Sequence, residues 1–287
     1  MTELILNDTV HISGEENNPA GHYFSATDLL NMAPNDTTIK AKTVGHGSFR
    51  VRDEDIRRGQ RTVGVTGHTE AASFQQLDER LQELEQWAEQ HVKLRLIGLG
   101  RDLWCEGIWE FTRPDELWPA LTNWSAKLTC EEPWLWSSTE QKLFLQSQAA
   151  ARGGLVFDEF AGISSFMWPL DWGDGGLDGN SGIVYNAGNA TGGPVITVYG
   201  NYPQGVTLMD SAGRSLVYDG PVLSGAPVTF DCRPGRCTVK SSGVNRSYLL
   251  SSREWFTVPK NSDLGISFLP HTTGTGWAEV SMRDVWL

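Results

Sequence analysis

The carboxylates of residues 171–180 are the densest group of potential metal ligands in the chain. Asp171, Asp174 and Asp178 are separated mainly by glycine there, and calcium takes about six to eight oxygen ligands. An EF-hand loop, however, needs ligands at alternating positions and a glutamate at its end, and the segment has neither. We therefore favour a flexible glycine-rich loop that its acids keep solvated, and we expect no metal site.

Other residues with catalytic potential do not form a known constellation. The histidines are scattered singly, and the sequence has no His-x-x-x-His pair, no Gly-x-Ser-x-Gly elbow and no Walker loop. Paired carboxylates for glycoside hydrolysis need not be close along the chain. Glu106, Glu110, Asp158 and Glu159 stay open as such candidates, although acids between aromatic residues are common on strand surfaces. We expect that the chain is not an enzyme and uses no cofactor.

Four cysteines are too few for a disulfide framework in a chain of 287 residues. Cys105 and Cys130 stand in apolar, strand-like contexts, which predicts buried thiols. Cys232 and Cys237 flank Arg-Pro-Gly-Arg, which is typical of a hairpin turn, so their side chains could face each other. A disulfide between them stays open, but a reducing cytoplasm opposes it, and a zinc site lacks a second ligand pair.

The twelve tryptophans raise the possibility of sugar binding, because an exposed indole can stack on a pyranose ring. Trp255 and Trp277, in expected strands, are the glycan-stacking candidates. Most of the others lie among apolar neighbours, which favours core packing.

A charged segment, FRVRDEDIRRGQR, is predicted to be a long loop between two strands within 38–66. It is a solvated hairpin tip, a contact arm toward a neighbouring subunit, or an anion site, and the acids at 53–55 argue against the last. Long charged loops are often functional, so we favour subunit contact, with the solvated tip a close alternative. The subunit-interface candidates are Arg50, Arg52, Arg57, Arg58 and Arg61.

One helix is predicted over 73–90. Apolar residues recur there at three- and four-residue steps, and Ser73 and Gln76 have capping-box spacing. Its apolar face is expected to pack on a sheet through Phe74, Leu77, Leu81, Leu84 and Trp87 or Ala88.

Strand-like runs fill most of the remaining sequence. The first half contains 3–12, the two strands within 38–66, KLRLIGLG, LWCEGIWEFT and a strand ending in KLTCEEPWLW. The second half contains short runs about ten residues apart, typical of an antiparallel sandwich: SSFMWPLDW, GIVYNAG, PVITVYG, GVTLMD, SLVYDG, PVTFDC, CTVKS, SYLLSS and WFTVP.

The predicted fold is mainly β with one prominent helix. The length of the chain predicts two domains. The N-terminal domain, over 1–138, is expected to be α+β, a β-sandwich or split barrel plus the helix. The C-terminal domain, over 139–287, is expected to be an antiparallel β-sandwich. Packing of the last strand, 279–287, back on the first domain is left open.

Composition narrows the function classes. A formal charge of −12, with no basic excess in either half, disfavours nucleic-acid binding. The N-terminus lacks the pattern of a signal peptide, and no apolar run approaches the length of a membrane span. We expect a protein made in a cytoplasm that does not enter a membrane.

Several segments, in order, resemble the phage distal tail and minor tail protein family. The most specific are WPLDWG (168–173), YNAGN (185–189) and GPVITVYG (193–200), within which Asn186 and Gly188 suit left-handed turn positions. TFDC (229–232), the C-terminal VSMRDVWL (280–287) and LTCEEPW (128–134) are also similar. Glu132, and Lys-Asn after Pro259, depart from the family pattern at turns.

The resemblance implies a virion structural protein at the distal end of the tail. Its first domain would form a six-membered ring under the tail tube, and its second, galectin-like sandwich would project outward. Partners would be other copies of the chain, the tail tube protein and the tip (tail-associated) protein of the baseplate hub. A ring needs a heterologous interface, for which 38–66 and 73–90 are the candidates. Alternatives are a carbohydrate-binding tail module that attaches to a host cell-wall glycan, and a tail-tip glycosidase.

Overall fold

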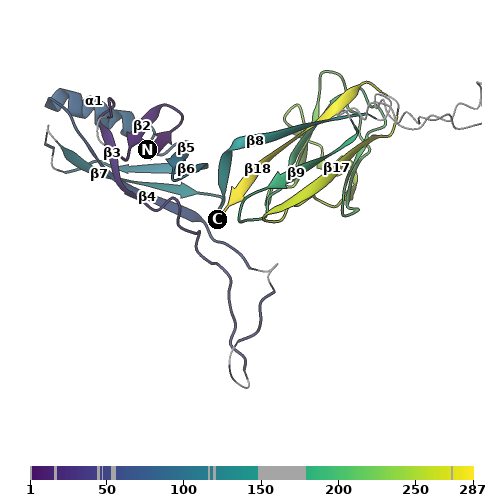
Figure 1. The fold of residues 1–287 in the computed structure, drawn as a ribbon, viewed down its shortest axis with the longest axis horizontal. Coiled ribbons are helices and arrows are strands. Elements are labelled where there is room, and N and C mark those ends of the chain that lie inside the picture. Colours follow the sequence, from purple (N-terminus) through teal and green to yellow (C-terminus); the bar gives the residue numbers. More distant parts are fainter. Residues whose placement is uncertain are drawn as a thin grey trace, which may run out of the picture. The chain divides into compact units, whose positions relative to one another are not determined.

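The computed structural model describes residues 2–15, 18–43, 46, 48–52, 56–115, 117–118, 121–147, 179–272 and 274–287. Its internal contacts divide the chain into two compact units (Figure 1), Met1–Thr139 with Val285–Leu287 and Glu140–Asp284. We call them the barrel unit and the sandwich unit. The aspartates of 171–178, the WPLDWG motif, the SSFMWPLDW run, Asp158, Glu159 and the acids at 53–55 lie outside the described residues. The ring-forming role expected for the first domain stays a prediction.

Seven strands of the barrel unit close on themselves. They follow one another around the barrel in the order β5-β1-β2-β3-β4-β7-β6, and β6 pairs with both β7 and β5. Only β2 and β3 pair in parallel among the registers described for these seven strands. The expected sandwich or split barrel is therefore a closed barrel. The strands are β1 (Glu3–Leu6), β2 (Val10–Ser13), β3 (His22–Thr27), β4 (Arg61–Thr69), β5 (His91–Gly98), β6 (Arg101–Thr112) and β7 (Thr122–Cys130).

Alternating burial explains why these segments form barrel strands. Along β7, the side chains of Trp124, Ala126 and Leu128 are buried, and those between them are exposed. Inward and outward positions alternate in this way on every strand of a closed barrel. Cys105 and Cys130 are both buried in this core, as predicted.

The single α-helix of the described chain, α1 (Phe74–Glu85), contributes to the same core. Leu77, Leu81 and Leu84 are fully buried, and the Ser73 side chain accepts a hydrogen bond from the Gln76 amide, which confirms the predicted cap. Phe74 is 61% exposed, so the prediction that it packs inward is wrong. It lies in the first turn, before the buried leucines begin. The indole of the buried Trp109 donates to the Leu84 carbonyl at 3.2 Å, which fixes the end of the helix.

The first expected strand, 3–12, is two strands. Asn7 and Asp8 both have positive φ, 49° and 55°, and between β1 and β2 they form a tight reversal. Asparagine and aspartate tolerate this conformation best among non-glycine residues. The Asn-Asp pair was the signal in the sequence for a turn here.

The two strands expected within 38–66 are reduced to one. Regular pairing begins at Arg61, the first residue of β4. In the described part of the preceding segment, strand pairing is limited to isolated bridges, Asn35 with Arg58 and Ala41 with Ser48. We call residues 32–60 the arm, and Figure 1 shows it extending away from the barrel below β4.

The sandwich unit has two layers of strands. One has the order β15-β14-β13-β10-β18-β8, and the other β16-β12-β11-β17-β9. Side chains from both layers form one core, as in an aligned sandwich. The strands are β8 (Leu135–Gln146), β9 (Ser181–Asn186), β10 (Val195–Gly200), β11 (Val206–Asp210), β12 (Ser215–Tyr218), β13 (Val228–Asp231), β14 (Thr238–Ser241), β15 (Val244–Asn245), β16 (Leu250–Arg253), β17 (Ser262–Pro270) and β18 (Gly276–Trp286), with a 3-10 turn at Ser247–Leu249.

Asn186 has a different role from the one its motif suggested. Neither it nor Gly188 is among the residues with positive φ. Its side chain is fully buried and donates to the carbonyls of Ala190 and Val258, at 2.8 and 3.1 Å, while its Oδ1 accepts from the Gly188 amide. Asn186 therefore joins the end of β9 to the segment around Val258 and supplies a buried donor to the carbonyls of Ala190 and Val258.

The sandwich unit corrects one further expectation and answers the question about the disulfide that the sequence left open. The WFTVP segment is not a strand, and its only ladder contact is the bridge between Gly192 and Val258. Cys232 and Cys237 are free thiols; Cys232 is buried, which raises its pKa to about 12, while Cys237 is exposed. Cys237 has a φ of 39° in the turn that leads into β14.

Candidate functional site

Two exposed surfaces carry the residues that the sequence singled out. One is the arm of the barrel unit, and the other lies on the outer face of β8, β18 and β10 in the sandwich unit.

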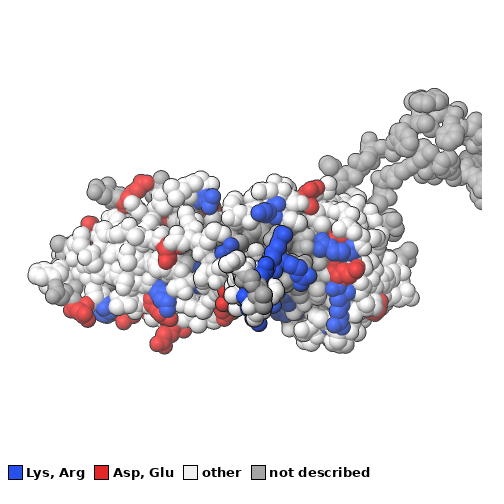
Figure 2. Space-filling model, turned by 90° about the horizontal axis from the view of Figure 1, so that it is seen from below, with Lys and Arg blue, Asp and Glu red and all other residues white. Residues whose placement is uncertain are grey.

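The arm combines positive charge with exposed apolar side chains. It has six Lys or Arg residues and four Asp or Glu residues, which gives it a net charge of +2, whereas the whole chain has a formal net charge of −12. Arg50, Arg52 and Arg57 are exposed and Arg58 is partly exposed, and Figure 2 shows basic side chains gathered in the middle of the view, where the arm points toward the reader. Its exposed apolar side chains are Met32 (57%), Ile39 (60%), Phe49 (58%) and Ile56 (45%).

Hydrogen bonds order the base of the arm. The Asp36 amide donates to the Arg57 carbonyl at 3.0 Å, and the Gly59 amide donates to the Pro34 carbonyl at 2.8 Å. The Thr37 hydroxyl accepts from the Arg57 amide at 2.7 Å. Farther out, the Phe49 amide donates to the Lys40 carbonyl at 2.9 Å. The arm is thus a loosely paired hairpin that starts from a well-bonded base.

Arg61 does not belong to the exposed arm, unlike the other four arginines proposed for the subunit interface. It is 1% exposed, and its guanidinium donates to three carbonyls: Leu29 at 2.8 Å, Asn31 at 2.6 Å and Pro133 at 2.9 Å. Burial lowers its pKa from the usual arginine value. Arg61 is therefore a structural residue that holds the chain entering the arm to the turn after β7.

The second surface is a row of three aromatic rings on neighbouring strands, which we call the aromatic row. Trp277 on β18 is 45% exposed and Phe144 on β8 is 54% exposed. Trp277 pairs in register with Tyr199 on β10, and their rings stack with centroids 5.2 Å apart and planes 22° apart. Of the two glycan-stacking candidates, Trp277 has the exposure that stacking requires.

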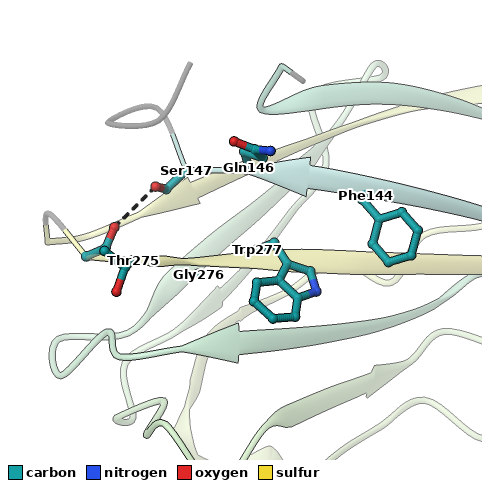
Figure 3. Close-up of a pocket in the computed structure, with 7 residues that line it drawn as sticks. Phe144, Gln146, Ser147, Thr275, Gly276 and Trp277 are labelled. Carbon is teal, nitrogen blue, oxygen red and sulfur yellow. Dashed lines mark hydrogen bonds between the residues drawn. The ribbon is translucent and has the colours of Figure 1, made fainter. Parts of the chain in front are cut away.

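A pocket of about 530 Å³ lies at one end of the aromatic row (Figure 3). Phe144, Gln146 and Ser147 line it from β8, and Gly274, Thr275, Gly276 and Trp277 line it from β18 and the residues before it. The Ser147 hydroxyl donates to the Gly274 carbonyl at 3.3 Å, which holds the two sides together. Sequence reasoning missed Phe144 because the 142–147 run was ambiguous between strand and helix.

Trp255 does not share this surface. It is only partly exposed, packs against the core of the sandwich unit, and lies outside the strands. Its carbonyl lies 3.5 Å from a guanidinium nitrogen of Arg214. Trp255 is therefore a packing residue, whereas the sequence had suggested an indole on a strand that could stack on a sugar.

Two of the four carboxylates named as glycosidase candidates, Glu106 and Glu110, lie within the described residues. Glu110 forms an ion pair with Lys127 at 3.2 Å, and both it and Glu106 are exposed on β6. Within the described ranges, no three His, Cys, Asp or Glu side chains are grouped as metal ligands. No helix of the described residues is long and apolar enough to cross a membrane.

Comparison with known proteins gives a likeness of fold. No protein-family model and no curated protein matches the chain. The solved structure of the Dit protein of SPP1, described as a paradigm of the hub adsorption apparatus in phages that infect Gram-positive bacteria, is 10% identical and aligns over 100% of both chains with a TM-score of 0.62. A chain of the phage P2 baseplate in its activated conformation with Ca is 9% identical, over 98% of both chains, with a TM-score of 0.50. The chain therefore shares the fold of the SPP1 Dit protein.

Proposed function

We propose that this chain is a structural protein of a phage tail tip, which assembles into a ring that joins the tail tube to the tip complex. The observation that carries the proposal is the fold shared with the SPP1 hub protein over the whole of both chains. A likeness over both units, and not over one sandwich or one barrel alone, favours the same kind of role. This role is structural and requires no catalytic residue, metal or cofactor.

A closed ring requires that one surface of each copy contacts a different surface of the next copy. The arm supplies one such surface, because its apolar side chains are exposed in the single chain and its charge is opposite to that of the chain as a whole. Exposed apolar side chains with arginines among them are typical of interfaces between proteins.

The outer face of residues 74–90, which we call the helix surface, is the complementary candidate. It has five acidic residues and one basic residue, a net charge of −4. Glu79, Glu83 and Glu89 are exposed, and so is Phe74. We propose that the arm of one copy contacts the helix surface of the next, pairing opposite charges around apolar contacts. The faces of this ring would contact the tail tube protein on one side and the tip protein on the other, at the distal end of the tail.

The mass of the purified full-length chain in solution tests this proposal. Light scattering should give six times the 31.7 kDa chain mass, and electron microscopy of the same peak should show closed rings. A monomer over the whole concentration range up to the limit of solubility would contradict ring formation. Open filaments would contradict closure, because they arise when the rotation between copies does not return to the first one.

A further inference from the structure

We propose that the aromatic row and its pocket form a binding site for a neutral pyranose oligosaccharide. The site belongs to the sandwich unit alone and does not depend on ring assembly. It would give the chain a ligand-binding activity in addition to the structural role.

The ring of Trp277 is exposed but held in place. Stacking on Tyr199 fixes its orientation, and cross-strand register fixes the two backbones. Phe144 extends from the adjacent strand, β8, and Figure 3 shows it next to Trp277. Binding on such a preformed platform costs little side-chain entropy. Two exposed rings on neighbouring strands present a flat apolar surface of the kind that the hydrophobic face of a pyranose covers.

Two glycines shape the wall of the pocket. A Cβ at Gly274 would lie 2.5 Å from the Asn201 carbonyl oxygen, and one at Gly276 would lie 2.1 Å from the Tyr199 carbonyl oxygen. A side chain at either position would therefore displace backbone. Glycine therefore allows residues 274–276 to lie close against the backbone of residues 199–201 at the edge of the pocket.

Polar groups beside the rings suit hydroxyls better than ions. Gln146 contributes an amide and Thr275 an exposed hydroxyl, and both groups donate and accept. The Ser147 hydroxyl is buried and donates to the Gly274 carbonyl, so it shapes the pocket wall. The nearest charges on the same strands, Lys142 and Glu279, pair with each other at 2.7 Å. The site thus presents neutral hydrogen-bonding groups next to an apolar platform. Its volume of about 530 Å³ lies in the usual range for small-ligand pockets, about 300–1,000 Å³.

Saturation-transfer NMR on the full-length chain tests the proposal with defined sugars. The probes are maltotriose, cellotriose, lactose and N,N′-diacetylchitobiose, each supplied separately at millimolar concentration, with sialyllactose as an anionic comparison. We expect saturation of ring protons in at least one neutral sugar, and a weaker signal from sialyllactose than from lactose. No transfer to any of the four neutral sugars, or transfer to sialyllactose alone, would overturn the proposal.

Variants locate the binding. Trp277→Ala and Phe144→Ala should each weaken the affinity for the bound sugar, Trp277→Ala by about tenfold or more, as expected for a central aromatic contact. Trp277→Tyr should retain part of the affinity because it keeps an aromatic face. Tyr248→Ala, a 64% exposed tyrosine of the same unit, is the matched control and should change nothing. Circular dichroism confirms folding of each variant, and affinity unchanged in both folded alanine variants of the row would overturn the assignment.

Discussion

The arm and the aromatic row are both exposed and both contain apolar side chains, but the fold holds them in different ways. The rings of the row stand on three regular strands, and one ring stacks on another. The arm leaves the barrel between β3 and β4 and has only isolated bridges and a few hydrogen bonds in its described part. A preformed surface suits a small ligand, whereas an extended surface with few internal contacts gains most of its contacts from a large partner.

The difference also explains the separate roles of the arginines. Arg61 at the base of the arm is buried and donates to three carbonyls through two of its guanidinium nitrogens, while Arg50, Arg52 and Arg57 are exposed. The base is part of the scaffold, and the outer arm is available for contact. Changes to the two should therefore separate stability from assembly.

The largest loss of stability is expected for Arg61→Ala. The change removes the donors to three carbonyls, and buried hydrogen bonds to a charged group contribute about 1.5–3 kcal/mol each. We expect the barrel unit to lose about 3 kcal/mol or more of unfolding free energy in urea, with the loss of hydrogen-exchange protection starting at the base of the arm. Arg57→Ala is the matched control and should change stability by less than about 0.5 kcal/mol. Equal effects of the two variants would contradict the distinction between base and arm.

Asn186→Ala should have the next largest effect, and it acts in the sandwich unit. It removes the buried donor to the Ala190 carbonyl and one of the two donors to the Val258 carbonyl, which costs about 2 kcal/mol. Hydrogen-exchange mass spectrometry should place the loss at the end of β9 and around Val258. The exposed Asn201→Ala serves as the control. If the aromatic row is preformed as proposed, sugar binding should persist in this folded variant under native conditions.

A smaller, pH-dependent effect is expected at His22 of the barrel unit. The imidazole is fully buried between the Thr69 hydroxyl, at 3.0 Å, and Glu83, at 3.3 Å. Burial lowers its pKa below 6.5, although Glu83 partly opposes the shift and Arg80 adds to it. The unfolded chain therefore binds the proton more readily, and stability that is complete above about pH 6.5 is lost as the pH falls below it.

The measurement is the unfolding free energy between pH 7.5 and 5.5. His22→Asn should flatten the loss on acidification. Glu83→Gln removes the group that raises the pKa of His22, so the loss of unfolding free energy on acidification should become steeper. A steeper loss in His22→Asn than in the unchanged chain would show that another group titrates instead.

The smallest effect on stability, and a large one on assembly, is expected for charge reversal in the arm. Replacing Arg50, Arg52 and Arg57 by glutamate should change the unfolding free energy by less than about 1 kcal/mol, because exposed charges contribute little. The ring, in contrast, should be lost. Reduced stability together with an intact ring would reverse the roles that we assign to the base and the outer arm.

Regular elements were predictable where burial repeats along the chain. The leucines of α1 at 77, 81 and 84 and the alternation in β7 confirm the periodic patterns. The general architecture, mostly β with one helix, followed from these patterns. Closure into a barrel did not, because it depends on pairings such as β6 with β7 and β4 with β7 that no local pattern specifies.

The sites were less predictable, because exposure of a single side chain depends on tertiary neighbours. Trp255 and Trp277 were both expected in strands of the sandwich, but one packs on the core and the other stands on an outer strand face. Arg61 is adjacent to the charged loop, and only the position of β4 in the barrel shows that it is buried. Asn186 resembled a turn residue, yet one of the carbonyls to which it donates, that of Val258, lies 72 residues away. Such long-range hydrogen bonds leave no signal in local sequence.

The most direct test of ring assembly through the arm is a charge exchange between the two proposed surfaces, read out as particle mass by light scattering. The arm variant (Arg50, Arg52 and Arg57 to Glu) and a helix-surface variant (Glu79→Lys with Glu89→Lys) should each be monomeric. A chain that carries both sets should recover a mass of six times 31.7 kDa, because attraction between the two surfaces is restored with opposite signs. Rings that persist in both single variants would contradict the account.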